Sequence, residues 1–230
     1  MKQPIILHIE TSTHVCSVAL SEGSTCLFSE INNDGMNHAA LLSVFISQAM
    51  EVLKQKNKKL DAVAVSSGPG SYTGLRIGVS TAKGLCYGLD IPMISVSTLE
   101  VITKQVLNSS NFDSETLFCP MIDARRMEVY AAIYNTNIEL IREISPDIID
   151  ENSYQDYLQN KQIVFFGNGS EKCKIAINHA NAVFIEDINP MAENMISFGL
   201  NAFLEKDFVD VAYFEPFYLK EFQTTTPKKL

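Results

Sequence analysis

The first half of the chain contains the stretch Ser66-Ser67-Gly68-Pro69-Gly70-Ser71-Tyr72-Thr73-Gly74-Leu75-Arg76-Ile77-Gly78. Strand-forming apolar residues precede it from residue 60, and helical spacing follows it to residue 87. Its glycines and proline suit a tight turn better than the interior of a helix or strand. Ser71 and Thr73 are N-cap candidates, so free N–H groups of a helix start would lie beside the glycines and attract phosphate or carboxylate. An ordinary strand-to-helix turn explains the pattern equally well.

Size and composition narrow the class of protein. The 230 residues suit one large domain or two modest lobes, and the formal net charge of -9 argues against nucleic-acid binding by the chain alone. Five scattered cysteines in apolar surroundings fit reduced thiols rather than a disulfide framework. No apolar run approaches the ~20 residues of a membrane span, and the N-terminus lacks a signal-peptide layout. We therefore expect a cytoplasmic protein with no membrane contact.

The periodicity of the remaining sequence predicts an α/β fold with mixed sheets and flanking helices. Up to residue 107 the expected order is βββαβαβα, a meander followed by parallel crossovers. The second half is expected to hold strands at 117–122, 128–134, 138–143, 162–166 and 182–185, with helices at 173–180 and from an Asn189 N-cap with Pro190. A polar segment from residue 108 divides the chain into lobes 1–107 and 108–230, and the aromatic tail is expected to pack back on the body.

Polar or glycine-rich residues end three of the expected strands. Glu10-Thr11-Ser12-Thr13 offers an acid that can orient water or a metal, with hydroxyls that can hold phosphate. Asp123-Ala124-Arg125-Arg126 offers guanidinium groups that can clamp a phosphate or carboxylate. The alternatives are a merely polar strand end and a structural ion pair between Asp123 and Arg126. The third end is the turn 167–170, Gly-Asn-Gly-Ser.

Three such strand ends in this order resemble the acid, phosphate and adenosine motifs of the actin, Hsp70 and sugar-kinase superfamily. The resemblance implies a two-lobed ribonuclease-H/actin-like (ASKHA) fold. It also implies a nucleotide-binding set that is either vestigial or shared with a partner at an interface: Glu10, Thr11, Gly68, Gly70, Ser71, Thr73, Asp123 and Arg126.

Residues 6–20, 68–78 and 123–130, together with Pro216-Phe217-Tyr218-Leu219-Lys220, more specifically resemble the bacterial TsaB family. This resemblance implies a non-catalytic scaffold that binds TsaD during synthesis of threonylcarbamoyladenosine on transfer RNA. It implies no cofactor for this subunit, with ATP or ADP and a metal held by TsaD. A TsaE-type ATPase would be a third member, and transfer RNA would bind only through the complex.

The histidine pattern argues against a metal site in this chain. TsaD-like relatives carry two metal-binding histidines with three residues between them on the helix after the meander, whereas here the position four residues after His38 is Leu42. TsaB relatives commonly have aspartate where this chain has Glu10. The competing hypothesis is an ATP-binding or ATP-hydrolysing enzyme that uses Glu10, Thr11, residues 68–73 and Asp123.

The helix after the glycine-rich turn carries small residues at helical spacing, Gly74, Gly78 and Ala82. Such a strip lets another helix approach closely, and that helix is either residues 36–53 of the same chain or part of another subunit. The family resemblance implies that this helix pair docks TsaD and self-associates when TsaD is absent. The expected interface residues are His38, Leu42, Phe45, Ile46, Gly74, Gly78, Ala82 and Leu85. The turn itself would then mainly set the angle of the docking helix, with any phosphate contact secondary.

Overall fold

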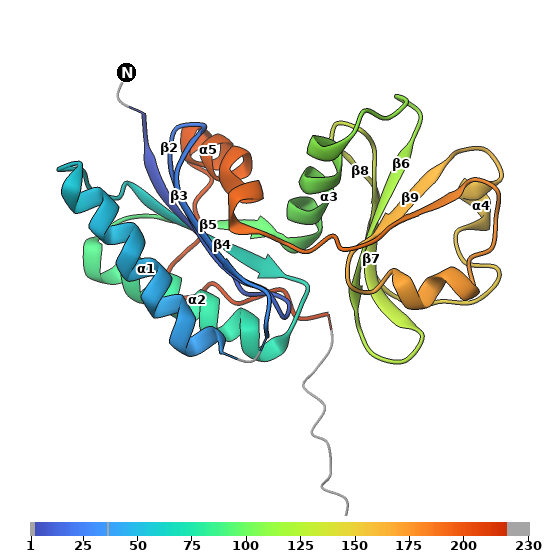
Figure 1. Cartoon of the computed structure of the whole chain (residues 1–230), viewed down its shortest axis with the longest axis horizontal. Helices are drawn as coiled ribbons and strands as arrows, with labels where there is room; N and C mark the ends of the chain where they lie inside the picture. The colour runs from blue at the N-terminus through green and yellow to red at the C-terminus, as the bar shows by residue number, and fades with distance from the viewer. Residues whose placement is uncertain (1–2, 36, 220–230) are drawn as a thin grey trace, which may run out of the picture.

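Two five-stranded mixed sheets form the two lobes of the computed structural model, which describes residues 3–35 and 37–219 (Figure 1). The first sheet has the order β3-β2-β1-β4-β5, in which β1, β2 and β3 are antiparallel and β4 and β5 are added in parallel. Its strands are β1 (Ile5–Glu10), β2 (Cys16–Glu22), β3 (Thr25–Asn32), β4 (Ala62–Gly68) and β5 (Met93–Ser97).

The second sheet repeats this topology in the order β10-β9-β6-β7-β8. Three antiparallel strands are again followed by two parallel additions. Its strands are β6 (Leu117–Asp123), β7 (Glu128–Tyr134), β8 (Leu140–Ile148), β9 (Ile163–Phe166) and β10 (Ala182–Ile185). The predicted α/β class with two lobes and mixed sheets is therefore confirmed. Strand β8 begins later than predicted because Ile138 has a left-handed backbone (φ 60°) in the preceding turn.

Helices cover both faces of the first sheet. Helices α1 (His38–Gln55) and α2 (Tyr72–Leu89) lie side by side on one face, where they bury Ile5, Leu7 and Ile9 of β1. The alternate residues of the same sheet face the other way, toward α5 (Ile196–Glu205) and the short 3-10 helix η2 (Ala192–Met195). Successive side chains of each strand therefore point alternately into two apolar layers, one on each face of the sheet.

The second sheet receives its own helices. Helix α3 (Thr98–Ser109) packs Leu99, Ile102 and Val106 on one face, while α4 (Gln155–Leu158) and the 3-10 helix η1 (Glu171–Ile175) lie on the other. Because α5 returns to the first sheet, the predicted second lobe 108–230 requires a correction. Residues from about 190 to 219 complete the first lobe, as Figure 1 shows for α5.

The tail follows α5 along the first lobe. The Val209 N–H donates to the Met93 carbonyl (3.0 Å), and the Phe217 N–H donates to the Ser67 carbonyl (2.7 Å). The rings of Tyr218 and Tyr72 lie 4.9 Å apart. The expected packing of the aromatic tail is confirmed as far as residue 219, while Lys220 lies outside the described residues. Within the described ranges, no helix has the length and apolarity to cross a membrane.

Two predicted helices differ from the observed ones. Asn189 and Pro190 do not begin the last helix. The helical segment begins with η2 at Ala192, whose N–H donates a hydrogen bond to Ser17 Oγ of β2 (2.9 Å). The helix predicted at 173–180 is only the single turn η1. After it, the Asn181 N–H donates to His179 Nδ1 (3.1 Å) and the chain enters β10.

Candidate functional site

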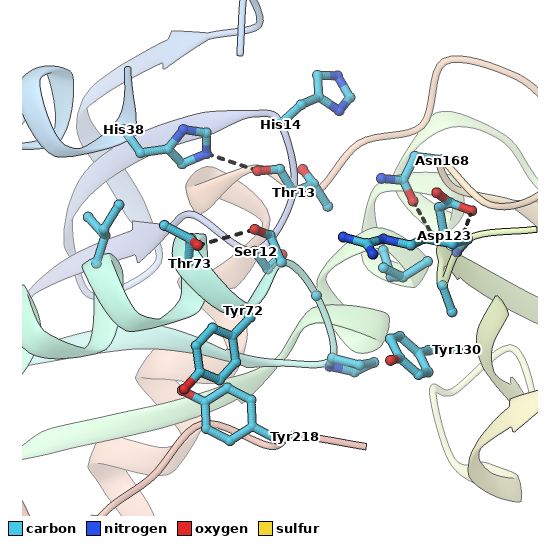
Figure 2. A pocket seen from close by; sticks show the side chains of 18 of the residues that line it. Ser12, Thr13, His14, His38, Tyr72, Thr73, Asp123, Tyr130, Asn168 and Tyr218 are labelled. Carbon is cyan, nitrogen blue, oxygen red and sulfur yellow. Dashed lines mark hydrogen bonds between the residues drawn. The ribbon is translucent and has the colours of Figure 1, made fainter. Parts of the chain in front are cut away.

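A cleft of about 1180 Å³ lies between the two lobes (Figure 2). The first lobe contributes the β1–β2 turn with Ser12, Thr13 and His14, and the start of α2. The second lobe contributes the β6–β7 hairpin and Asn168. Tail residues 217–219 complete the lining. The fold therefore brings together the strand-end motifs that the sequence singled out.

Ser71 is the N-cap of α2, as predicted. Its hydroxyl accepts a hydrogen bond from the Gly74 N–H (3.2 Å), which satisfies one of the free donors of the first helical turn. The Ser71 N–H donates to the Ser12 carbonyl (2.6 Å), so the turn is attached to the end of β1. Thr73 lies inside the helix, exposed at the cleft.

The glycines of this stretch pack closely against the β1–β2 turn. A Cβ atom at Gly70 would overlap the Ser12 carbonyl oxygen, and one at Gly74 would overlap that of Thr11. At Gly78 it would overlap the Thr11 hydroxyl. The strip of small residues is thus explained by close packing of α2 on β1, which was neither of the alternatives considered from sequence.

Glu10 and Thr11 lie beneath the cleft, not in its lining. Glu10 is fully buried, and its Oε1 accepts a hydrogen bond from the Ser12 N–H (2.6 Å). Burial raises the pKa of the Glu10 carboxyl above its ordinary value. The Thr11 hydroxyl donates to the Gly74 carbonyl (2.8 Å). Both side chains thus join β1 to its neighbours, and contact of these two residues with a nucleotide stays a prediction.

Gly68 also serves a structural purpose. Its backbone is left-handed (φ 109°), which favours glycine, and an added Cβ would come within 3.0 Å of the Phe217 carbonyl oxygen. Gly68 thus makes room for the tail and does not line the cleft. The other predicted contacts, Gly70, Ser71, Thr73, Asp123 and Arg126, do line it.

Asp123 is held by the second lobe. Its carboxylate forms an ion pair with Lys172 and accepts a hydrogen bond from the Arg125 N–H (3.2 Å), while its own N–H donates to Asn168 Oδ1 (2.9 Å). The suggested Asp123–Arg126 ion pair is replaced by the pair with Lys172. No local pattern indicates this partner, because it lies 49 residues further along the chain.

Arg125 and Arg126 form the tip of the β6–β7 hairpin. Both have left-handed backbones, with φ values of 70° and 48°, and both side chains are exposed at the cleft. The Glu128 N–H donates to the Arg125 carbonyl (3.1 Å) and closes the hairpin. Among residues 3–35 and 37–219, neither guanidinium group has an ion-pair partner.

Most of the expected interface residues are buried in the core of the first lobe. Six of them are buried in or against the first lobe's own core: Leu42, Phe45, Ile46, Gly74, Gly78 and Ala82. Leu85 is half-buried against the same core. A partner on this helix pair would therefore meet other residues of α1 and α2.

His38 is also half-buried, but at the cleft, where its Nε2 donates to the Thr13 carbonyl (2.9 Å). The position where a second metal-binding histidine would stand is filled by the core residue Leu42. In the part of the chain that the structure describes, no three potential metal-ligating side chains come together.

Comparison with known proteins identifies relatives over most of the chain. The family described as TsaD, tRNA N6-adenosine threonylcarbamoyltransferase, matches residues 32–223. The tRNA threonylcarbamoyladenosine biosynthesis protein TsaB of Escherichia coli is 30% identical over 225 residues, covering 94% of each chain. TsaB of Bacillus subtilis is 35% identical over 142 residues, which cover 62% of this chain and 60% of the relative.

A solved structure shares the fold. It is described as an uncharacterized protein with similarity to peptidase YEAZ from Pseudomonas aeruginosa, and it superimposes with a TM-score of 0.81 at 24% identity. The match covers 94% of this chain and all of the other chain (100%). The fold, the motifs at the strand ends and the full-length relative agree: the chain belongs to the TsaB family.

Proposed function

We propose that this protein is a non-catalytic scaffold subunit in the synthesis of N6-threonylcarbamoyladenosine on transfer RNA, where it binds and supports TsaD. The names of its relatives and the match to the TsaD family support this role. In this proposal, ATP or ADP and the metal belong to TsaD, a TsaE-type ATPase joins the complex, and transfer RNA binds through the assembly. Without TsaD, the chain forms a homodimer.

The placement of the acids supports a non-catalytic subunit. Glu10 is buried and hydrogen-bonded to the Ser12 N–H, so it does not reach a ligand in the cleft. Asp123 is already paired with Lys172. An enzyme that activates water for ATP hydrolysis needs a general base within hydrogen-bond reach of that water, whereas Glu10 does not line the cleft and Asp123 is paired with Lys172.

The observation that carries the docking proposal is the outer surface of α1 and α2. We call it the docking face and define it by Val44 of α1 and by Ser80, Gly84, Tyr87 and Gly88 of α2. Tyr87 is 87% exposed and Val44 49% exposed. A Cβ at Gly84 or Gly88 would meet no atom of residues 3–35 and 37–219 within 4 Å, so this part of the chain supplies no packing reason for either glycine.

Exposed helix surfaces in soluble proteins ordinarily carry charged residues and strong helix formers. The exposed positions of α1 from residue 39 to 48 hold only alanine, serine, valine and glutamine. A helical glycine loses roughly 1 kcal/mol relative to alanine. An approaching helix of a partner would offset this loss, because small residues let two backbones come close.

Size-exclusion chromatography of the chain mixed with TsaD from the same organism tests the docking face. Gly84→Arg and Val44→Arg should each weaken co-elution at least tenfold without lowering the thermal midpoint, because both sites are exposed. Asn201→Arg, at an exposed position of α5 on the other side of the sheet, is the matched control and should bind normally.

Normal co-elution of both docking-face variants would refute this surface as the contact. A failure of the wild-type chain to bind TsaD at all would refute the scaffold role itself. The mass of the chain measured alone reports the homodimer, which the same two substitutions should dissociate.

A further inference from the structure

We propose that the tail is a built-in stop that limits how far the two lobes can close over the cleft. The stop consists of residues 215–219, which lie where the described tail ends between the lobes (Figure 1). These residues rest on the first lobe and stand in the path of β8 of the second lobe. The inference does not depend on the docking face or on TsaD.

The lobes are joined tightly along α3, which directly follows β5. Its buried side chains pack into both lobes, that of Val101 into the core of the first and three others into the core of the second: Leu99, Ile102 and Val106. All four residues are 0% exposed. Such close packing resists separation, so relative motion of the lobes is expected to pivot about α3. No residue of α3, all of which is described, lines the cleft, so the cleft lies on the side that can widen or narrow.

The first lobe holds the stop in place. The Phe217 N–H donates to the Ser67 carbonyl near the end of β4 (2.7 Å). The Tyr218 ring lies 4.9 Å from that of Tyr72 at the start of α2. Immediately before the stop, Phe214 packs against the core of the first lobe. We therefore expect residues 215–219 to move with the first lobe rather than with the second.

The segment that leads into the stop is also constrained. The Phe214 N–H donates to the Asp210 carbonyl (2.9 Å), and the Ala212 N–H donates to Asp210 Oδ1 (2.8 Å), which together close a turn. Lys83 Nζ of α2 donates to the Ala212 carbonyl (3.1 Å) and ties this turn to the helix. Pro216 fixes its own φ angle. The stop is thus supported along its length and cannot simply bend away from an approaching strand.

The second lobe faces the stop across an apolar gap of about 430 Å³. Ile144 of β8 lines this gap on the side of the second lobe, and four tail residues line it on the other: Phe214, Pro216, Phe217 and Tyr218. Phe217 is 45% exposed and Tyr218 37% exposed, so their rings are not pressed against the second lobe. Closure of the lobes would bring Ile144 onto these rings before β8 could reach the ends of β4 and β5.

Pulsed electron paramagnetic resonance between labels on the two lobes tests the stop. Suitable sites are Ala39→Cys in α1 and Glu171→Cys in η1, which are both exposed. The half-buried Cys26 is replaced by serine, and the other four cysteines are buried. Labelled chain is diluted into unlabelled chain, so that only distances within one molecule are measured.

A chain that ends after residue 214 lacks the stop but keeps Phe214 in the core. Its distances should shift by several ångströms toward shorter values, because the second lobe can then advance beyond the apolar gap. A chain that ends after residue 219 is the matched control and should give the distances of the full chain. The double variant Phe217→Ala/Tyr218→Ala keeps the tail backbone and should give a smaller shift in the same direction.

Unchanged distances in the shortened chain would overturn the stop. Longer distances would also overturn it, because the tail would then draw the lobes together. Thermal melts show whether the shortened chain is folded; if it is not, the double variant decides by the same two criteria. Because these measurements use the chain without TsaD, their result is independent of the scaffold proposal.

Discussion

Alanine substitution at three glycines of α2 should give opposite effects on stability within one helix. At Gly84 the added methyl group meets no atom of the described residues within 4 Å, so only the gain in helix propensity remains, about 0.5–1 kcal/mol. At Gly78 the methyl group would displace the Thr11 side chain. The lost hydrogen bond from Thr11 to the Gly74 carbonyl (about 1 kcal/mol) and the overpacking (about 1–3 kcal/mol) exceed that gain.

The expected net result is a loss of about 1–3 kcal/mol for Gly78→Ala. Gly74→Ala should be worse, because the methyl group would overlap the Thr11 carbonyl oxygen, and a backbone atom cannot move aside as a side chain can. Urea unfolding followed by far-UV circular dichroism measures the free energies. For a chain of this size, each kcal/mol also shifts the thermal midpoint by about 2–4 °C. Stabilisation by Gly78→Ala equal to that by Gly84→Ala would refute the packing of α2 against Thr11.

Two further predictions concern buried titratable groups of β1. Burial lowers the pKa of His8 to about 3, so between pH 6.5 and 3 the unfolded chain binds a proton that the folded chain does not. The free energy of unfolding should therefore fall as the pH drops through this range, by up to about 1.4 kcal/mol per pH unit. In thermal melts at several pH values, His8→Gln should remove this part of the pH dependence. Burial raises the pKa of the Glu10 carboxyl, so the free energy of unfolding should fall as the pH rises above 4.5. Glu10→Gln keeps an acceptor for the Ser12 N–H and should raise the thermal midpoint at pH 7 but not at pH 4. A lower midpoint of this variant at pH 7 would contradict the argument.

Local signals in the sequence predicted much of the fold. The alternation of apolar residues and the turn residues located the strands of both sheets, and Ser71 was identified as the cap of α2 because capping depends on neighbouring residues. The doubled topology of the sheets was not apparent, because the two halves share a pattern of hydrogen bonding rather than a repeated sequence.

Contacts between distant residues explain the errors. Gly74 and Gly78 pack against Thr11, which lies more than sixty residues earlier in the sequence (63 for Gly74). The partner of Asp123 is likewise remote in sequence. The return of α5 to the first sheet depends on apolar faces of strands that periodicity alone cannot assign to a particular helix. The candidate cleft was therefore predicted in outline, whereas the roles of Glu10, Thr11 and Gly68 were not.

The return of α5 has a consequence for biosynthesis on the ribosome. The first sheet is encoded before residue 98, but Met195 and Phe198, which cover its second apolar face, are translated about a hundred residues later. At translation rates of roughly 5–20 residues per second, Ile6, Ala64 and Ile94 remain uncovered for seconds while the second lobe is made. During this time the nascent chain exposes an apolar sheet face to which chaperones can bind, and this face is covered only when α5 has been synthesised.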